Sequence, residues 1–352
     1  MNLPEKLSRM TAYEPVRGDY PVRLDANESF LETPPWLRDA VAAAVAQVPL
    51  HRYPDPTASG VRRLAARLYG VDAAHITAGS GSDELIALSM AALVPRGGRV
   101  LLTDPDFSMY RVYAGLYELD CFAVGKAGRR VEIDAVLAEA KRIQPHLIIF
   151  SNPCNPTGLG VTRPEALRLA DGADCPVAVD EAYMDFWDQS LIGDLPGRDN
   201  LLILKTCSKA YGLAGLRLGF ALAGPDITAA LQKSRSPYNV SALTQAAGEA
   251  ALSHPDYLAD CAARLREAAA ALYQALSALS ARSNGAFRAL PTETNFVLLE
   301  TPNAPKIYES LRAQGILIRL LNNTLLRVTA GTPEEQRALL AGLEAEQYIR
   351  SQ

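Results

Sequence analysis

Short apolar runs that end in turns of polar residues limit the folds open to this chain. Four such runs are predicted to be strands, over residues 99–103, 147–150, 176–179 and 201–204. Apolar runs of this length, separated by helical stretches, are typical of parallel strands that are buried on both faces. We therefore predict an α/β fold in which ligands bind at the carboxyl ends of the strands.

Helices and one further strand are predicted around these runs. A helix is predicted to follow Thr33 and to run to about residue 48. Residues 57–69 have the apolar spacing of an amphipathic helix, which Gly70 can cap. Strand 218–223 is predicted to run antiparallel to its neighbours, because its connection from residue 204 is short for a crossover helix.

The C-terminal third of the chain predicts a second, smaller α/β domain. An alanine-rich helical stretch covers residues 241–282, and strand-like segments follow it at 295–299, 316–319 and 326–329. Thr332 and Pro333 then mark the start of a final helix, as its N-cap and its first residue. The predicted division is an N-terminal arm at residues 1–35, a large domain at 36–240 and a small domain at 241–352.

Composition excludes several classes of protein. The 352 residues are 49% hydrophobic and 21% charged, which is typical of a globular protein long enough for two domains. A net charge of -4 provides no basic domain for nucleic acid. No apolar signal segment and no apolar run of membrane-spanning length is present, so we expect a cytoplasmic protein with no membrane partner.

The spacing of cysteines and histidines indicates neither a disulfide framework nor a metal site. The five cysteines are scattered and lack CxxC spacing. The four histidines are far apart and form no HExxH pattern.

The glycine-rich stretch 205–219 follows the last of the four apolar runs and contains the main candidate for a reactive residue. Partial desolvation in such a turn makes the amine of a lysine nucleophilic, and Lys209 is placed there. An amine nucleophile suits bonding to a carbonyl compound or to pyridoxal phosphate (PLP). Lys205, in contrast, is expected to be a surface lysine.

Residues 76–92 contain a second candidate turn. Gly79-Ser80-Gly81-Ser82 precedes a helix, and small residues at a helix N-terminus let backbone N–H groups approach an anion. The pattern is neither a Walker A loop nor a dinucleotide-binding fingerprint. The alternative is an ordinary glycine turn capped by Ser82, and the two interpretations stay open on this stretch alone.

Polar residues at the predicted strand ends can supply the parts of a PLP site. Lys209 offers the amine, and Asp180 offers a carboxylate that can keep the pyridine nitrogen protonated. Asn155 and Tyr183 can donate to the phenolate oxygen, and Tyr110 can cover the ring, with a plain core position as its alternative. The predicted phosphate cradle consists of Ser82, Asp83, Thr206, Ser208 and Arg217.

These motifs, taken in order, resemble those of the fold-type I PLP-dependent aminotransferases, the aspartate aminotransferase superfamily. The motifs are Asn155-Pro156-Thr157-Gly158, residues 180–183 and residues 208–217. Within the superfamily the chain most resembles the histidinol-phosphate aminotransferases, through residues 24–28, 52–56, 81–84, 326–329 and 331–332. The resemblance implies a large domain with a mostly parallel seven-stranded sheet sandwiched by helices, plus a smaller α/β C-terminal domain.

The resemblance also implies roles for individual residues. Lys209 would hold PLP and move the substrate proton, and Asp180 would pair with the pyridinium nitrogen. Tyr53 would bind the cofactor phosphate of the partner subunit, which implies a homodimer with shared active sites and an arm that packs on the small domain or the partner. The implied substrate contacts are Tyr13, Asn155 and Arg327, with Arg337, one residue out of register in the last helix, as a further candidate.

The leading hypothesis is a histidine-biosynthesis enzyme that transfers an amino group between L-histidinol phosphate and 2-oxoglutarate, which becomes glutamate. Arg327 can bind either a carboxylate or a phosphate, so an aromatic amino-acid aminotransferase and a PLP-dependent phospho-amino-acid decarboxylase stay open as alternatives. A non-catalytic PLP-binding regulator is expected to carry a DNA-binding extension, and none is recognised. A nicotinamide dehydrogenase is disfavoured because no GxGxxG motif is present.

Overall fold

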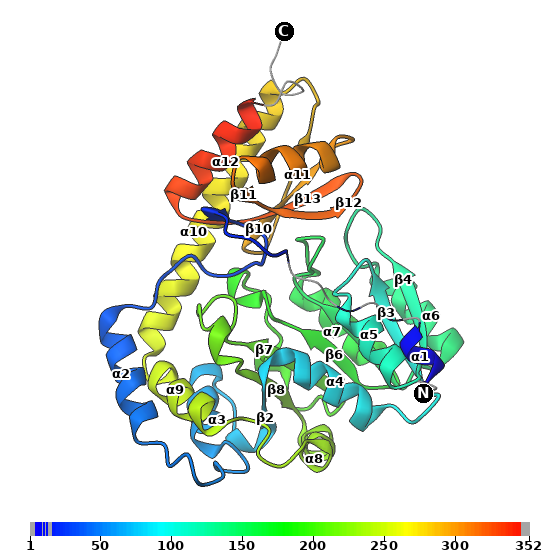
Figure 1. Ribbon diagram of the computed structural model, residues 1–352. Coiled ribbons are helices and arrows are strands. Elements are labelled where there is room, and N and C mark those ends of the chain that lie inside the picture. The colour runs from blue at the N-terminus through cyan, green and yellow to red at the C-terminus, as the bar shows by residue number, and fades with distance from the viewer. Residues whose placement is uncertain (1–3, 9, 11, 13–15, 346–352) are drawn as a thin grey trace.

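The computed structural model describes residues 4–8, 10, 12 and 16–345, and a seven-stranded sheet lies at the centre of its larger part (Figure 1). The strand order is β2-β8-β7-β6-β5-β3-β4. The strands are β2 (Ile76–Gly79), β3 (Arg99–Asp104), β4 (Asp120–Gly125), β5 (Leu147–Ser151), β6 (Val177–Asp180), β7 (Leu201–Thr206) and β8 (Gly219–Ala223). Strand β8 runs antiparallel to both neighbours, whereas β4, β3, β5, β6 and β7 pair in parallel. The predicted mostly parallel α/β sheet is therefore confirmed.

Helices bury both faces of this sheet. Alternate residues of β5 point to opposite sides, so Leu147 and Ile149 join one hydrophobic cluster whereas Ile148 and Phe150 join another. The helices that contribute to the first of these clusters are α4 (Gly81–Leu93), α5 (Met109–Leu116) and α8 (Pro225–Ser234). The helices that contribute to the second include α3 (Ser59–Tyr69), α6 (Ile133–Ile143) and α7 (Arg163–Gly172). Burial on both faces explains the uninterrupted apolar runs in the sequence.

A four-stranded antiparallel sheet forms the centre of the smaller part, drawn above the large sheet in Figure 1. Its order is β12-β13-β10-β9, with β9 (Arg288–Leu290), β10 (Phe296–Glu300), β12 (Arg319–Asn322) and β13 (Leu325–Thr329). Helices α11 (Ala304–Ala313) and α12 (Pro333–Ala345) pack on it. The predicted cap of the final helix is confirmed, because the Glu335 backbone N–H donates to the Thr332 hydroxyl at 3.1 Å.

Helix α10 (Pro255–Arg282) extends along both parts of the molecule (Figure 1). Leu258 and Leu265, in its first half, join the core of the large sheet, whereas Leu272 and Leu276 join the core of the small one. Helices α2 (Pro35–Ala46) and α9 (Ala242–Leu252) pack on each other, and the Trp36 ring of α2 contacts the Tyr257 ring in the first turn of α10. One continuous helix therefore connects the two cores, and the division at residue 240 stays a prediction.

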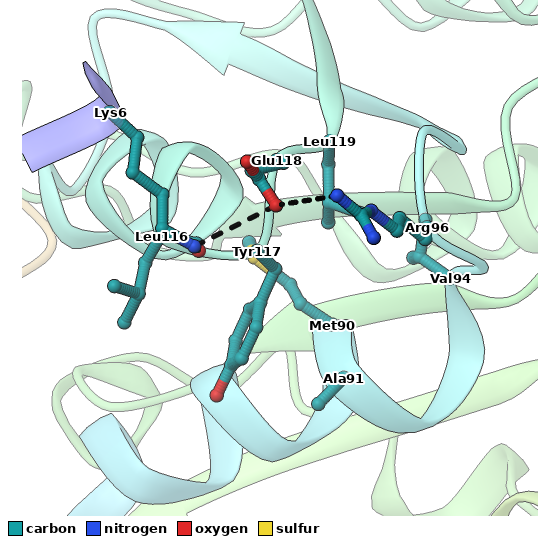
Figure 2. A pocket seen from close by; sticks show the side chains of 9 residues that line it. All are labelled: Lys6, Met90, Ala91, Val94, Arg96, Leu116, Tyr117, Glu118 and Leu119. Atoms are coloured by element: carbon teal, nitrogen blue, oxygen red, sulfur yellow. Dashed lines mark hydrogen bonds and ion pairs between the residues drawn. The ribbon is translucent and has the colours of Figure 1, made fainter. Parts of the chain in front are cut away.

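The N-terminal arm contacts both parts of the molecule. Strand β1 (Val22–Arg23) pairs in parallel with β11 (Ile316–Leu317). Helix α1 (Glu5–Ser8) lies against α5, where the Lys6 ammonium donates to the Leu116 carbonyl at 2.8 Å. A cavity of about 360 Å³ lies at this contact. In Figure 2 the Glu118 carboxylate lies between the Lys6 ammonium, at 3.7 Å, and the Arg96 guanidinium, at 3.5 Å.

Most of the predicted elements agree with the structure, but several elements were not predicted, among them the strands β4 and β9. Helix α3 ends at Gly70, whose φ of 68° is the left-handed conformation of a C-cap, as predicted. The antiparallel strand 218–223 is confirmed as β8. Strand β4 lies at the sheet edge, where Asp120 and Cys121 are exposed, and its apolar stretch 121–124 was not predicted to be a strand.

Three features are absent from the described part of the chain. No helix there is both long enough and apolar enough to span a bilayer. No group of histidine, cysteine and acidic side chains in those ranges is arranged to hold a metal ion. The five cysteines are free thiols.

Gly219 tests how closely β8 approaches the start of α4. A Cβ atom at this position would lie 2.6 Å from the Ser82 backbone nitrogen and 3.0 Å from the Lys205 carbonyl oxygen. Because backbone atoms cannot move aside cheaply, we expect Gly219→Ala to lower the free energy of unfolding by roughly 1–3 kcal/mol, measured by urea titration. Gly125→Ala is the matched control, since a Cβ there meets no atom within 4 Å. Equal stability of the two variants would contradict this account of the packing.

Candidate active site

The polar residues predicted from the sequence lie where parallel strands end. Ser151 at the end of β5 is in register with Asp180 at the end of β6, and Asp180 is in register with Leu204 of β7. The chain after each strand then turns through Asn155, Tyr183 or Lys209. A parallel sheet brings these turns to one edge, which is the edge that binds ligands in open α/β folds.

Asp180 is a buried carboxylate at the centre of this edge. One oxygen accepts from the Tyr110 hydroxyl at 2.8 Å, and the other accepts from the Ala182 backbone N–H at 3.1 Å. Burial raises the pKa of Asp180 to about 7, although both hydrogen bonds act to lower it. Within the described ranges no lysine, arginine or histidine forms an ion pair with this carboxylate. A pyridinium nitrogen would supply the missing cation, so this side chain fits PLP.

A second group of residues forms a place for an anion at the start of α4. The Arg217 guanidinium lies 3.1 Å from the Asp83 carboxylate and 3.5 Å from the Ser208 hydroxyl. Gly81 has a φ of 80°, and a Cβ on it would lie 2.7 Å from the Arg217 guanidinium, so no side chain fills this space. The helix N-terminus and the arginine can both stabilise a phosphate there.

The hydroxyl pair of the lysine turn is buried beside this place. The Ser208 backbone N–H donates to the Thr206 hydroxyl at 3.2 Å, and both side chains lie below the surface. Ser82 is the second residue of α4, as a cradle of backbone N–H groups requires. The structure therefore brings the predicted cradle residues to one end of β7 and α4.

Lys209 lies between the large sheet and the N-terminal arm. Its ammonium is 5.8 Å from the centre of the Tyr183 ring and donates to the Ala26 carbonyl at 3.4 Å. The Tyr183 hydroxyl accepts from the Asn27 side-chain amide at 2.8 Å. The sequence placed residues 24–28 in the N-terminal arm and in the family resemblance, but the contact of Asn27 with the lysine turn was missed because the partners are far apart in the chain.

Arg327, from the smaller part of the molecule, lies beside the turn that contains Asn155. From β13 its guanidinium donates to the Asn155 side-chain oxygen at 2.8 Å and to the Asp25 carbonyl at 2.7 Å. The guanidinium also lies 5.4 Å from the centre of the Phe296 ring. Arg327 and Asn155, which are 172 residues apart, are therefore neighbours, and their role in substrate binding stays a prediction.

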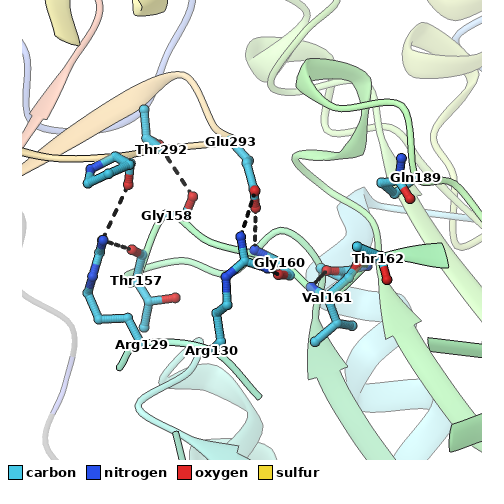
Figure 3. A network of polar contacts seen from close by, with 12 residues as sticks. Arg129, Arg130, Thr157, Gly158, Gly160, Val161, Thr162, Gln189, Thr292 and Glu293 are labelled. Carbon is cyan, nitrogen blue, oxygen red and sulfur yellow. Dashed lines mark hydrogen bonds and ion pairs between the residues drawn. The ribbon is translucent and has the colours of Figure 1, made fainter. Parts of the chain in front are cut away.

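A network of polar contacts holds the Asn155 turn against the smaller part (Figure 3). The Glu293 carboxylate accepts from the Gly160 backbone N–H and from Arg130, the latter at 3.2 Å. The Glu293 backbone N–H donates to the Gly158 carbonyl at 2.7 Å. Arg129 adds a bond of 2.9 Å to the Thr157 carbonyl. These contacts fix the end of the turn that presents Asn155, and no sequence pattern indicates them.

Three predicted residues are not brought to this site by any contact that the structure describes. Tyr53 is 81% exposed, and its ring stacks on that of Tyr238 with 4.5 Å between centroids. Arg337 lies on the exposed side of α12 and pairs with Glu334 at 2.7 Å. Tyr13 lies outside the described residues. Their roles stay predictions.

The expectation that Lys205 is a surface lysine is wrong. Its exposed fraction is 2%, and its ammonium lies 3.1 Å from Asp185 and 3.8 Å from Glu181. Burial acts to lower the pKa of Lys205, but the two carboxylates outweigh that effect and raise it. Strand β7 is buried on both faces, so every side chain in it must enter a core, and this lysine is a buried structural cation.

Comparison with known proteins identifies the family. The family model described as aminotransferase class I and II matches residues 21–343. The chain belongs to this family. It is a PLP-dependent aminotransferase with the aspartate aminotransferase-like fold, as the motifs predicted.

Individual relatives are similar over nearly the whole chain. Histidinol-phosphate aminotransferase of Chromobacterium violaceum is 39% identical over 348 residues, which cover 96% of each protein. The crystal structure of histidinol-phosphate aminotransferase from Sinorhizobium meliloti in complex with pyridoxal-5'-phosphate has a TM-score of 0.87 and 26% identity, and it covers 99% of this chain and 97% of that one. L-threonine-O-3-phosphate decarboxylase from Porphyromonas gingivalis has a TM-score of 0.79 and 25% identity, over 92% of this chain and 98% of that one.

The raised pKa of Asp180 predicts how the stability of the PLP-free protein depends on pH. Its pKa is about 7 in the folded protein against an ordinary 3.8, so between these values the folded state binds a proton that the unfolded state has lost. The free energy of unfolding should therefore fall as pH rises through this range, by up to a few kcal/mol at about 1.4 kcal/mol per pKa unit.

Asp180→Asn cannot ionise, so this variant should lack the fall. Urea titrations of both proteins at a series of pH values measure the difference. Asp188→Asn, at an exposed carboxylate, is the control and should behave like the unsubstituted protein. The same pH dependence in Asp180→Asn and in the unsubstituted protein would show that Asp180 does not titrate in this range.

Proposed function

We propose that this aminotransferase transfers an amino group between L-histidinol phosphate and 2-oxoglutarate, in the biosynthesis of histidine. The observation that carries the proposal is the 39% identity with histidinol-phosphate aminotransferase of Chromobacterium violaceum over nearly the full length of both chains. The similar structure of histidinol-phosphate aminotransferase from Sinorhizobium meliloti supports it over 99% of this chain.

The residues of the described site fit the cofactor of this reaction. When bound, PLP supplies an electron sink for the amino-acid carbon that exchanges its amino group. Asp180 would hold the ring nitrogen in its protonated form, and Arg217 with the N-terminus of α4 would hold the phosphate. The Lys209 amine would bind the cofactor aldehyde and move the substrate proton.

Substrate recognition would depend on Arg327. A guanidinium presents paired donors that suit a carboxylate or a phosphate, and 2-oxoglutarate and histidinol phosphate each carry such a group. Asn155 and the Asp25 carbonyl hold two nitrogens of this guanidinium, which orients its plane. A substrate bound by Arg327 would thus lie where the Asn155 turn, β13 and the arm meet.

Two alternatives with the same fold stay open on substrate chemistry. The similarity to L-threonine-O-3-phosphate decarboxylase favours a phospho-amino-acid decarboxylase, which would release carbon dioxide instead of exchanging an amino group. An aromatic amino-acid aminotransferase would bind a substrate without phosphate. Arg327 suits each of these substrates.

We further propose that the protein is a cytoplasmic homodimer in which Tyr53 completes the partner's phosphate site. Tyr53 and Tyr238 form a stacked pair that is largely exposed within one chain, although aromatic rings gain from burial. The prolines on either side of Asp55 stiffen the segment that presents Tyr53.

A substrate panel tests the proposed activity. With purified protein loaded with PLP, we expect glutamate to form from histidinol phosphate and 2-oxoglutarate with a kcat/KM above that for phenylalanine. It should also be at least tenfold above that for histidinol, which lacks the phosphate, because a charge-assisted contact is worth roughly 1.5–3 kcal/mol. Lys209→Ala, which lacks the amine, should be inactive. Release of carbon dioxide from phosphothreonine, with no amino transfer from histidinol phosphate, would favour the decarboxylase instead.

A mixing experiment tests the shared site. Tyr53→Phe removes one hydroxyl and should weaken PLP binding by about 0.5–1.5 kcal/mol, or somewhat more because the phosphate is charged. Mixed with Lys209→Ala, it forms heterodimers. If Tyr53 acts across the dimer, one site has both defects and the other has neither, so activity should appear at the PLP concentration that the unsubstituted enzyme needs.

The same mixture gives a different result if Tyr53 acts within its own subunit. If Tyr53 serves its own subunit, each lysine-containing site keeps the Tyr53→Phe defect, and the PLP requirement stays raised. A refolded mixture of unsubstituted protein with Lys209→Ala is the control for heterodimer formation.

A further inference from the structure

A thiol and an amine are in direct contact beside the active site. The Lys126 amine nitrogen lies 2.8 Å from the Cys154 sulfur. Cys154 is 1% exposed, and the Lys126 side chain is also 1% exposed. Cys154 directly precedes Asn155, which contacts Arg327, whereas Lys126 follows the edge strand β4. None of the steps assigned to the active site uses either group.

Neighbouring oxygens hold the Lys126 amine against the sulfur. The amine donates to the Pro105 carbonyl at 2.8 Å and to the Asp106 carboxylate at 3.1 Å. Asp106 is itself fixed, because it accepts from the Thr103 hydroxyl at 2.6 Å and from the Ser151 hydroxyl. The sulfur lies 3.6 Å from the Pro105 carbonyl. Two groups held together in this way react far more readily than the same groups free in solution.

We propose that hydrogen peroxide joins Cys154 and Lys126 through a single bridging oxygen atom, as Sγ–O–Nζ. The thiol loses its S–H bond and the neutral amine loses one N–H bond, and S–O and O–N bonds form in their place. Sulfur and nitrogen each give up two electrons. Two peroxide molecules accept these four electrons as their O–O bonds break. One of the four peroxide oxygens becomes the bridge and the other three leave as water.

The separation of the two atoms favours the oxygen bridge over a direct S–N bond. A single S–N bond would draw the nitrogen much closer to the sulfur than 2.8 Å and away from Pro105 and Asp106. With one inserted oxygen, the nitrogen and the sulfur can stay nearly as far apart as they are now. The lysine can therefore keep its rotamer, and its remaining N–H can still donate to Asp106. The link therefore needs little movement in a closely packed region.

The protonation of both groups sets the conditions for the reaction. Burial and Asp106 raise the pKa of the Cys154 thiol, although Lys126 acts to lower it. Burial acts to lower the pKa of Lys126, but Asp106 and Cys154 outweigh it and raise the pKa. The thiolate and the free amine are the reactive forms, so alkaline buffer should speed up the link.

Mass spectrometry of the peroxide-treated holoenzyme tests the link. We use Cys121→Ser as background, because Cys121 shares a tryptic fragment with Lys126 and could otherwise form a disulfide with Cys154. After treatment at alkaline pH, alkylation in denaturant and digestion with trypsin, the fragments with Lys126 and Cys154 should appear as one species. Because trypsin should not cleave after the linked Lys126, the mass should exceed the sum of fragments 112–129 and 143–168 by one oxygen less two hydrogens. Dithiothreitol should restore both fragments.

Two variants in the same background are the controls. Lys126→Arg keeps a cation beside Asp106 but lacks the lysine amine, and Cys154→Ser lacks the sulfur, so neither should give the linked species. The proposal is overturned if no linked species forms, or if its mass lacks the added oxygen. It is equally overturned if Cys154 is oxidised to sulfinic acid to the same extent with and without the lysine.

Discussion

Burial of the large sheet on both faces is the constraint on which the rest of the structure depends. The apolar side chains along β5, β6 and β7 enter one of two hydrophobic cores, so the strands themselves have little room for charge. Polar groups of the site therefore gather where the strands end. That edge is also where backbone N–H groups and turn residues remain available to a ligand.

Two ionisable side chains, Lys205 and Asp180, are buried although burial disfavours charge, and their surroundings differ. Lys205 enters the core of the large sheet from β7 and is neutralised by Asp185 and Glu181. Removing one partner from such a group leaves an uncompensated buried charge, so we regard this cluster as part of the framework. Asp180 has no cation of its own within the described residues, and its raised pKa reflects that. The difference separates a structural charge from one that fits a cofactor.

The site is complete only where three parts of the chain meet. The turn with Asn155 comes from the large sheet, Arg327 from the small one, and the carbonyls of Asp25 and Ala26 from the arm. Glu293 binds the end of the Asn155 turn to the segment before β10. A change in the position of the smaller part would thus move Asn155 and Arg327 together, which couples the proposed substrate contacts to the packing of the two cores.

The sequence alone determined the central buried strands and the chemistry of the strand ends. Continuous apolar runs require strands buried on both faces, and the residues after them, Asp180 and Lys209 among them, are fixed at one edge by the parallel pairing. Tertiary structure decided what depends on contacts between distant residues. No local pattern relates the residues of three such contacts. They are the ion pair of buried Lys205 with Asp185, the hydrogen bond between Arg327 and Asn155, and the hydrogen bond between Asn27 and Tyr183. Periodicity records which way a side chain faces along its own strand or helix, but the partner that it meets there is set by how the elements pack.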